Sequence, residues 1–136
     1  MAALPDRLAS ILGEILSVEV ESDGALTVRH NGTFASLRVV RIADDLDLMS
    51  LTQVLAWDLP LTKKIRDLVA REAREVNFGA LTLLEKAPEK GTRGAKTGDV
   101  MLRYNFPGAG LTDDALRTLI LLVLDTGARI RGELIA

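Results

Sequence analysis

The stretch that most resembles a chemical motif is rich in glycine and lysine and covers residues 91–97, with the sequence GTRGAKT. A phosphate-binding loop of this kind needs a glycine directly before its lysine and a helix directly after it. Here Ala95 precedes Lys96, and the residues that follow alternate as a strand does. We therefore interpret the stretch as a solvated connection between two strands, which predicts no phosphate or cofactor site.

Four cationic side chains gather in and beside this connection. Cations alone attract a phosphate backbone regardless of its sequence, whereas recognition of single strands also needs aromatic rings that stack on bases. No aromatic residue accompanies the four, and the formal net charge of the chain is -2. We expect only weak, sequence-independent contact with a polyanion or an acidic tail, through Lys86, Lys90, Arg93 and Lys96.

Other candidate ligands do not form a recognisable set. Asp44, Asp45 and Asp47 cluster where a turn is expected, but they lack the glycine-assisted bend and the distal bidentate glutamate of a calcium loop. The chain has no cysteine and one histidine, His30, which excludes thiolate centres and any site that needs two imidazoles. We accordingly predict no catalytic, metal-binding or cofactor-binding residues, and a protein that is not an enzyme.

Length and composition set the class of protein. Of the 136 residues 48% are hydrophobic, enough for one core in a single domain over residues 1–136. The absence of cysteine fits a reducing compartment. The first residues lack the layout of a signal peptide, and the longest apolar run, residues 119–124, is too short to cross a bilayer. We therefore expect a cytoplasmic protein that does not enter a membrane.

A dipeptide of Asn31 and Gly32 sets the register of the first strands. It favours a two-residue turn because both central residues of such a turn need positive φ. The turn pairs apolar residues of the flanking strands on one face, namely Val28 with Ala35 and Leu26 with Leu37.

The two longer strands that follow, residues 33–42 and 46–57, carry apolar side chains on both faces. An antiparallel sheet that is covered on one side should alternate more cleanly between apolar and polar residues. We therefore expect the second face to be covered in part, by a helix or by another chain.

The remaining pattern completes an α+β chain. Helical spacing appears at residues 4–16 and 65–77, strands are expected at residues 80–85 and 100–106, and a last helix follows Thr112. The predicted order is α-β-β-β-(β)-α-β-β-α, in which three helices flank an antiparallel sheet of five to six strands. The strand that decides this count is residues 18–22.

The last helix has apolar residues outside its main stripe. Leu121 and Leu124 lie on a side that also carries charged residues. Isolated exposed leucines are normal, but a partner surface explains them equally well. Gly127, on the core side, would permit a close approach to the sheet. Trp57, the only tryptophan, is a candidate anchor in the core or at the rim of a partner surface.

Three segments in order resemble the YbjN family, whose members are often labelled bacterial sensory transduction regulators. They are residues 75–83 (EVNFGALTL), 98–107 (GDVMLRYNFP) and 110–112 (GLT). The resemblance lies in the succession of helix, Asn, strand, Gly-Asp, strand, Pro, Gly-Leu-Thr and helix, and it covers most of the chain. That family is similar in fold to type III secretion chaperones.

The resemblance implies a compact α+β domain that is usually a homodimer and binds without catalysis. Secretion chaperones hold an extended client segment along apolar grooves, and their middle helix commonly forms the dimer contact. By this resemblance Leu68 and Val69 are candidate dimer contacts. We therefore expect a chaperone-like or regulatory adaptor that acts as a homodimer and holds a segment of a partner protein. The alternative is a small-molecule-binding sensor with a pocket between sheet and helices.

Overall fold

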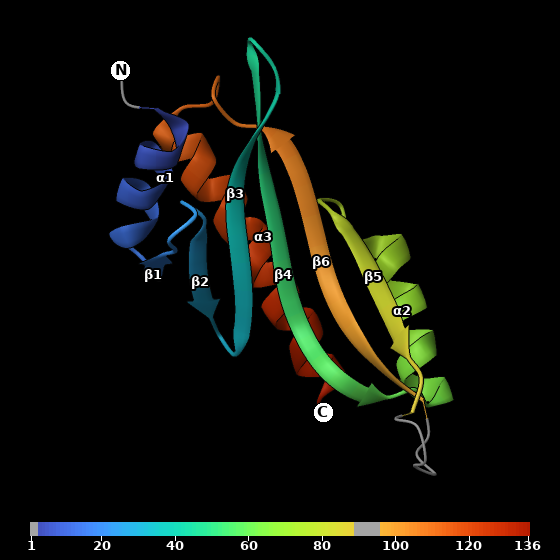
Figure 1. The fold of residues 1–136 in the computed structure, drawn as a ribbon. Helices are drawn as coiled ribbons and strands as arrows, with labels where there is room; N and C mark the ends of the chain where they lie inside the picture. Colours follow the sequence, from blue (N-terminus) through green and yellow to red (C-terminus); the bar gives the residue numbers. More distant parts are fainter. Residues whose placement is uncertain (1–2, 89–95) are drawn as a thin grey trace.

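A computed structural model of the chain describes residues 3–88 and 96–136, which form six strands and three helices (Figure 1). The expected α+β class and element order are confirmed, and the sheet has six strands because residues 17–20 pair as a strand. The elements are α1 (Leu4–Gly13), β1 (Ser17–Val20), β2 (Leu26–His30), β3 (Thr33–Ala43), β4 (Leu46–Pro60), α2 (Lys63–Glu75), β5 (Ala80–Lys86), β6 (Thr97–Pro107) and α3 (Asp113–Leu134).

All strands belong to one antiparallel sheet in the order β1-β2-β3-β4-β6-β5. The turn between β2 and β3 has the expected form, since Asn31 and Gly32 have φ values of 47° and 84°. It pairs His30 with Thr33, and the two apolar pairs that the sequence predicts are present and buried. One dipeptide therefore sets the pairing of β2 with β3.

The three helices pack on the same face of the sheet, because α1 and α2 each contact α3 while α3 lies across β4 (Figure 1). The core lies between this helical layer and the sheet. Its fully buried side chains include Leu8, Leu12, Leu37, Met49, Leu51, Leu55, Leu102, Leu116, Ile120 and Ile130. None of the helices in the described ranges is long and apolar enough to serve as a membrane span.

The opposite face of the sheet is open in a single chain. Within residues 3–88 and 96–136 no helix packs on this face, and it carries the apolar row Phe34, Val54 and Met101 together with the exposed Trp57. The apolar residues that the sequence places on both faces of β3 and β4 are therefore covered by helices on one face only.

A buried glutamine joins α3 to the sheet. Gln53 of β4 is 0% exposed, and its Nε2 donates to Thr33 Oγ1 (2.9 Å) and to the carbonyl of Leu124 (3.1 Å). Its Oε1 lies against Gly127, where an added Cβ would be only 2.1 Å away. The expected close approach of α3 to the sheet at Gly127 is confirmed, and the absence of a side chain there leaves room for the amide of Gln53.

A second polar contact joins α3 to α2. Glu72 of α2 is 2% exposed, and both of its carboxylate oxygens accept hydrogen bonds from the Arg129 guanidinium of α3, at 3.2 and 3.0 Å. These bonds lower the pKa of Glu72 against the opposing effect of burial. Arg71 and Glu133 complete the cluster at 3.5 Å from each other.

This cluster predicts a pH-dependent contribution to stability. Because the pKa of Glu72 is lower in the folded chain than its ordinary value of 4.5, the stabilisation is complete above that value and is lost as the pH falls through the folded pKa. Glu72→Gln should lower the free energy of unfolding by about 1–3 kcal/mol near neutral pH. The loss should shrink as the pH falls through the lowered pKa of the folded chain, because the wild-type carboxylate then becomes protonated.

Denaturant unfolding over a series of pH values from neutral to well below 4.5 measures this difference. Glu133→Gln is the matched control, because Glu133 is 43% exposed and its pairs lie at 3.5 and 3.7 Å. An equal loss for Glu72→Gln across the pH series would contradict the assignment.

Candidate functional site

The pairing of β3 leaves part of its edge open. β2 begins at Leu26, opposite Leu37, so β3 has no partner from β2 beyond that point. β3 itself continues to Ala43 and there pairs with β4 alone. Residues 38–43 therefore have one paired side and one open side.

Alternation along β3 shows which backbone groups face this open edge. Opposite residues in an antiparallel pair alternate between hydrogen-bonded and non-hydrogen-bonded pairs. The two-residue turn makes His30 and Thr33 a bonded pair, so odd-numbered residues of β3 direct their N–H and C=O groups toward β2. Beyond Leu37 these residues are Val39 and Arg41. Among the described residues neither has a backbone partner on that side.

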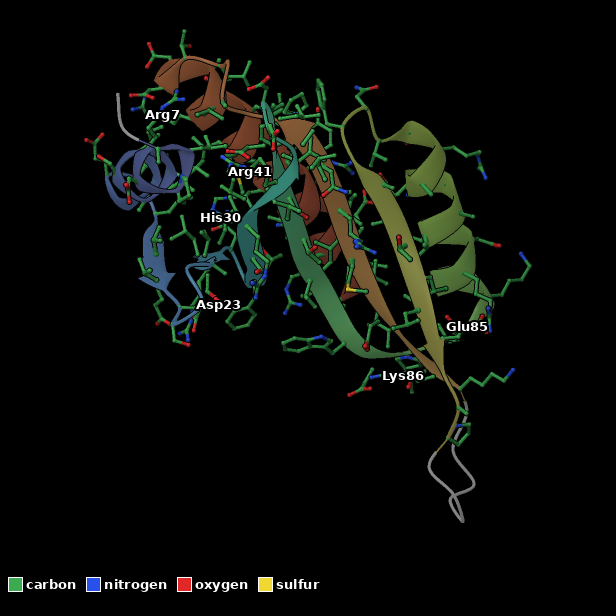
Figure 2. The ribbon with its side chains drawn as sticks, turned by 45° about the horizontal axis from the view of Figure 1, so that its top comes forward. Arg7, Asp23, His30, Arg41, Glu85 and Lys86 are labelled. Carbon is green, nitrogen blue, oxygen red and sulfur yellow. The ribbon has the colours of Figure 1, made fainter. Side chains whose placement is uncertain are left out.

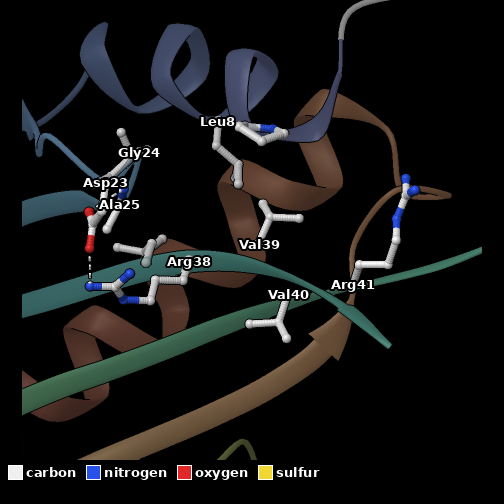
Figure 3. Close-up of a pocket in the computed structure, with 11 residues that line it drawn as sticks. Leu8, Asp23, Gly24, Ala25, Arg38, Val39, Val40 and Arg41 are labelled. Carbon is white, nitrogen blue, oxygen red and sulfur yellow. Dashed lines mark hydrogen bonds and ion pairs between the residues drawn. The ribbon is translucent and has the colours of Figure 1, made fainter. Parts of the chain in front are cut away.

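A groove of about 440 Å³ lies beside the open edge (Figure 3). Residues 38–41 of β3 line one side, and α1 contributes Pro5 and Leu8. The turn before β2 contributes Asp23 and Gly24. The groove thus combines apolar side chains with backbone donors and acceptors that have no strand partner. We call it the β3 groove.

The α1 wall of the β3 groove is anchored to the start of α3. Arg7 of α1 points toward that region (Figure 2). Its Nε donates to Asp113 Oδ1 (2.9 Å), and its Nη2 donates to the carbonyl of Leu111 (2.6 Å). The position of α1 is therefore fixed relative to the start of α3.

Charged residues border the β3 groove. Asp23 accepts a hydrogen bond from the backbone N–H of Ala25 (3.1 Å) and pairs with Arg38 (2.7 Å), and both contacts lower the pKa of Asp23. Arg41 pairs with Asp47 of β4 at 3.2 Å, with its own side chain 70% exposed. The Asp23–Arg38 pair joins the turn before β2 to β3. The guanidinium groups of Arg38 and Arg41 both lie at the rim of the groove.

Trp57 lies away from the β3 groove. It is 59% exposed and stacks on Phe34, with ring centroids 5.9 Å apart and an interplanar angle of 23°. The guanidinium of Arg29 lies 5.3 Å from the centre of the Phe34 ring. The expectation that Trp57 anchors a partner surface stays a prediction, on the open face of the sheet.

The other expected contact residues lie differently from the prediction. Leu124 is fully buried because its turn of α3 faces Gln53, so its expected place on a partner surface is wrong; Leu121 is half-buried. Leu68 and Val69 are 8% and 6% exposed, because α2 packs its one apolar face onto its own sheet. They belong to the core of the chain and are not available as dimer contacts.

Two further candidates have structural partners. His30 is not an isolated surface residue, since its Nε2 lies 2.7 Å from Asp125 Oδ1 of α3. Lys86 contacts both Asp58 and Asp99, which compensates its charge and raises its pKa. Of the other three expected polyanion contacts, Lys96 is exposed, and Lys90 and Arg93 lie outside the described residues.

Comparisons with known proteins give a relationship of fold. No family model matches the chain, and no curated protein matches it. Among solved structures it is similar to the crystal structure of YbjN from E. coli, "a putative transcription regulator", with 14% sequence identity and a TM-score of 0.63. The match covers 96% of this chain and 90% of that chain. It supports the resemblance to YbjN at the level of the fold.

The open edge predicts an alternating pattern of hydrogen exchange. The amides of Val39 and Arg41 should exchange about tenfold or more faster than that of Val40, which faces β4. NMR-detected exchange measures these rates, with the amide of Leu37 as a control because Leu37 pairs with Leu26 of β2. Equal protection of Val39, Val40 and Leu37 would show that the edge is covered.

Proposed function

We propose that this chain is a non-enzymatic, cytoplasmic adaptor or regulator that holds an extended segment of a partner protein in the β3 groove. The observation on which this rests is the unpaired edge of residues 38–43 beside an apolar wall from α1. An extended peptide can add to such an edge as a further strand, with backbone hydrogen bonds for affinity and side-chain contacts for specificity.

The geometry of the β3 groove defines what such a segment would contact. Val39 and Arg41 offer two donors and two acceptors in one line, as a strand partner requires. Pro5 and Val39, which line the groove and are not fully buried, would contact its apolar side chains. Arg38 and Arg41 at the rim are already paired with Asp23 and Asp47, so the rim offers polar contacts of both signs of charge to the segment.

A regulatory role agrees with the likeness in fold to YbjN. With a net charge of -2, the chain offers no overall positive field for nucleic acid. We therefore propose that the chain regulates by binding a segment of another protein, and not by binding nucleic acid.

Selection from a library of short displayed peptides tests this function. The enriched peptides should carry alternating apolar residues, as an added strand does, and Val39→Pro should weaken their binding by about tenfold or more because proline removes the outward N–H. Since that N–H faces away from β4, the β3–β4 pairing should survive, which circular dichroism can verify. Arg38→Glu is a second variant that leaves the backbone unchanged.

Arg103→Gln is the matched control, because Arg103 is an exposed residue of β6 that does not line the β3 groove. Failure to enrich any peptide, or full binding by folded Val39→Pro and Arg38→Glu variants, would contradict the proposal.

We also propose that the chain acts as a homodimer, through a surface other than α2. The end of the β3–β4 hairpin exposes three apolar side chains, Val40, Ile42 and Leu46, at 42%, 56% and 41%. A second copy would remove this apolar area from water.

Light scattering should give a mass twice the 14.7 kDa of one chain at micromolar concentration. The double variant Ile42→Ser and Leu46→Ser should shift the protein to monomer, whereas Ile135→Ser, equally exposed but at the C-terminus, should not. A monodisperse 14.7 kDa wild-type species would exclude the homodimer.

A further inference from the structure

A small second pocket lies at the end of the sheet that carries the β2–β3 turn. Its volume is about 140 Å³, and it is lined by Gly32 of the turn, Phe34 of β3, Val54 and Trp57 of β4, and Arg131 of α3. It shares no lining residue with the β3 groove. We call it the Trp57 pocket.

The aromatic residues of the Trp57 pocket are unusually accessible for their size. Phe34 and Trp57 are 38% and 59% exposed, although they stack on each other. Aromatic side chains contribute large apolar areas to binding surfaces, and a further ring can stack on an exposed indole face. The pocket therefore offers a flat apolar surface to a ligand.

Arg131 supplies a positive charge beside these rings. Its Nη1 donates to the carbonyl of Leu55 (2.7 Å), and its Nε lies 2.8 Å from the position that a Cβ at Gly32 would take. The guanidinium is therefore held against the turn at a defined place. A guanidinium has five N–H donors, so this single bond leaves most of them available.

The charge of Arg131 is not compensated within the described part of the chain. No carboxylate there lies within 4.0 Å of Arg131, nor of the neighbouring Arg29, whereas Arg129 in the same helix holds Glu72 with two hydrogen bonds. A half-buried cation without a counter-ion favours an anionic partner, and guanidinium binds carboxylate with particular strength and geometry.

From this arrangement we propose that the Trp57 pocket binds a carboxylate carried by a flat apolar group. Such a group is either a free aromatic acid or the C-terminal residue of a polypeptide. The ring would lie on Trp57 and Phe34, and the carboxylate would accept hydrogen bonds from Arg131, with Arg29 adding to the positive field. The volume of about 140 Å³ lies below the roughly 300–1,000 Å³ of drug-sized sites, so the pocket favours a small ligand such as a single ring with its carboxylate.

The single tryptophan of the chain reports on this pocket directly. Phenylacetate, and a short peptide ending in phenylalanine with a free carboxylate, should each produce a saturable change in Trp57 fluorescence. Phenylacetamide and the same peptide with an amidated end are the matched ligands without the charge. They should bind about tenfold or more weakly. The tighter of the two acids identifies the source of the carboxylate.

Arg131→Gln should weaken binding of the acids by about tenfold or more. Arg103→Gln should leave it unchanged, because Arg103 is an exposed arginine of β6 that does not line the pocket. If Arg131→Gln does not fold, NMR titration of the wild-type protein provides the second measurement. Phenylacetate should then shift the Trp57 indole and Gly32 amide signals and leave the Val39 amide in the β3 groove unshifted.

Equal binding of acid and amide, full binding by folded Arg131→Gln, or no saturable response would overturn the proposal. The β3 groove is tested separately, since Val39→Pro should leave binding of phenylacetate unchanged.

Discussion

The close contact of α3 with β4 at Gln53 and Gly127 determines how the helical layer sits on the sheet. A side chain at position 127 would collide with the amide of Gln53, and the bond from that amide to the Leu124 carbonyl sets the rotation of α3 about its axis. Three polar contacts of the same helix depend on that rotation. Asp125 meets His30, Arg129 meets Glu72 of α2, and Arg131 reaches the carbonyl of Leu55, at the positions that make the Trp57 pocket possible.

Placing all three helices on one face has a second effect, on the edges of the sheet. Beyond β2, α1 lines one wall of the β3 groove without pairing with the edge of β3, and Arg7 fixes α1 to the start of α3. Residues 38–43 of β3 are left with an unpaired side, although their other side pairs with β4, with a shift of register between Arg41 and Ala43. The β3 groove and the Trp57 pocket lie at opposite ends of β3, and each includes a residue from the helical layer.

Local chemistry made much of the fold predictable. The positive φ values that Asn31 and Gly32 tolerate determined a register that the structure confirms residue by residue. The orientation of α3 was not predictable from apolar periodicity, because a polar residue, Gln53, decides which side faces the sheet; Leu124 was misplaced for this reason. The open edge exists because β2 has 5 residues and β3 has 11. Apolar periodicity predicts that both strands exist, but it does not predict that the longer strand has an unpaired edge beside a groove. Arg131 and Phe34 come together only through the fold, so no spacing in the sequence indicates the pocket that they share.

An unpaired strand edge is also a hazard, because identical edges on other molecules can pair with it and form fibrous aggregates. Charged side chains on an edge strand hinder such pairing, and here Arg38 and Arg41 lie on that edge, with side chains 54% and 70% exposed. A second edge could pair here only by taking these charged side chains out of water. The two arginines therefore oppose the growth of fibres from this edge.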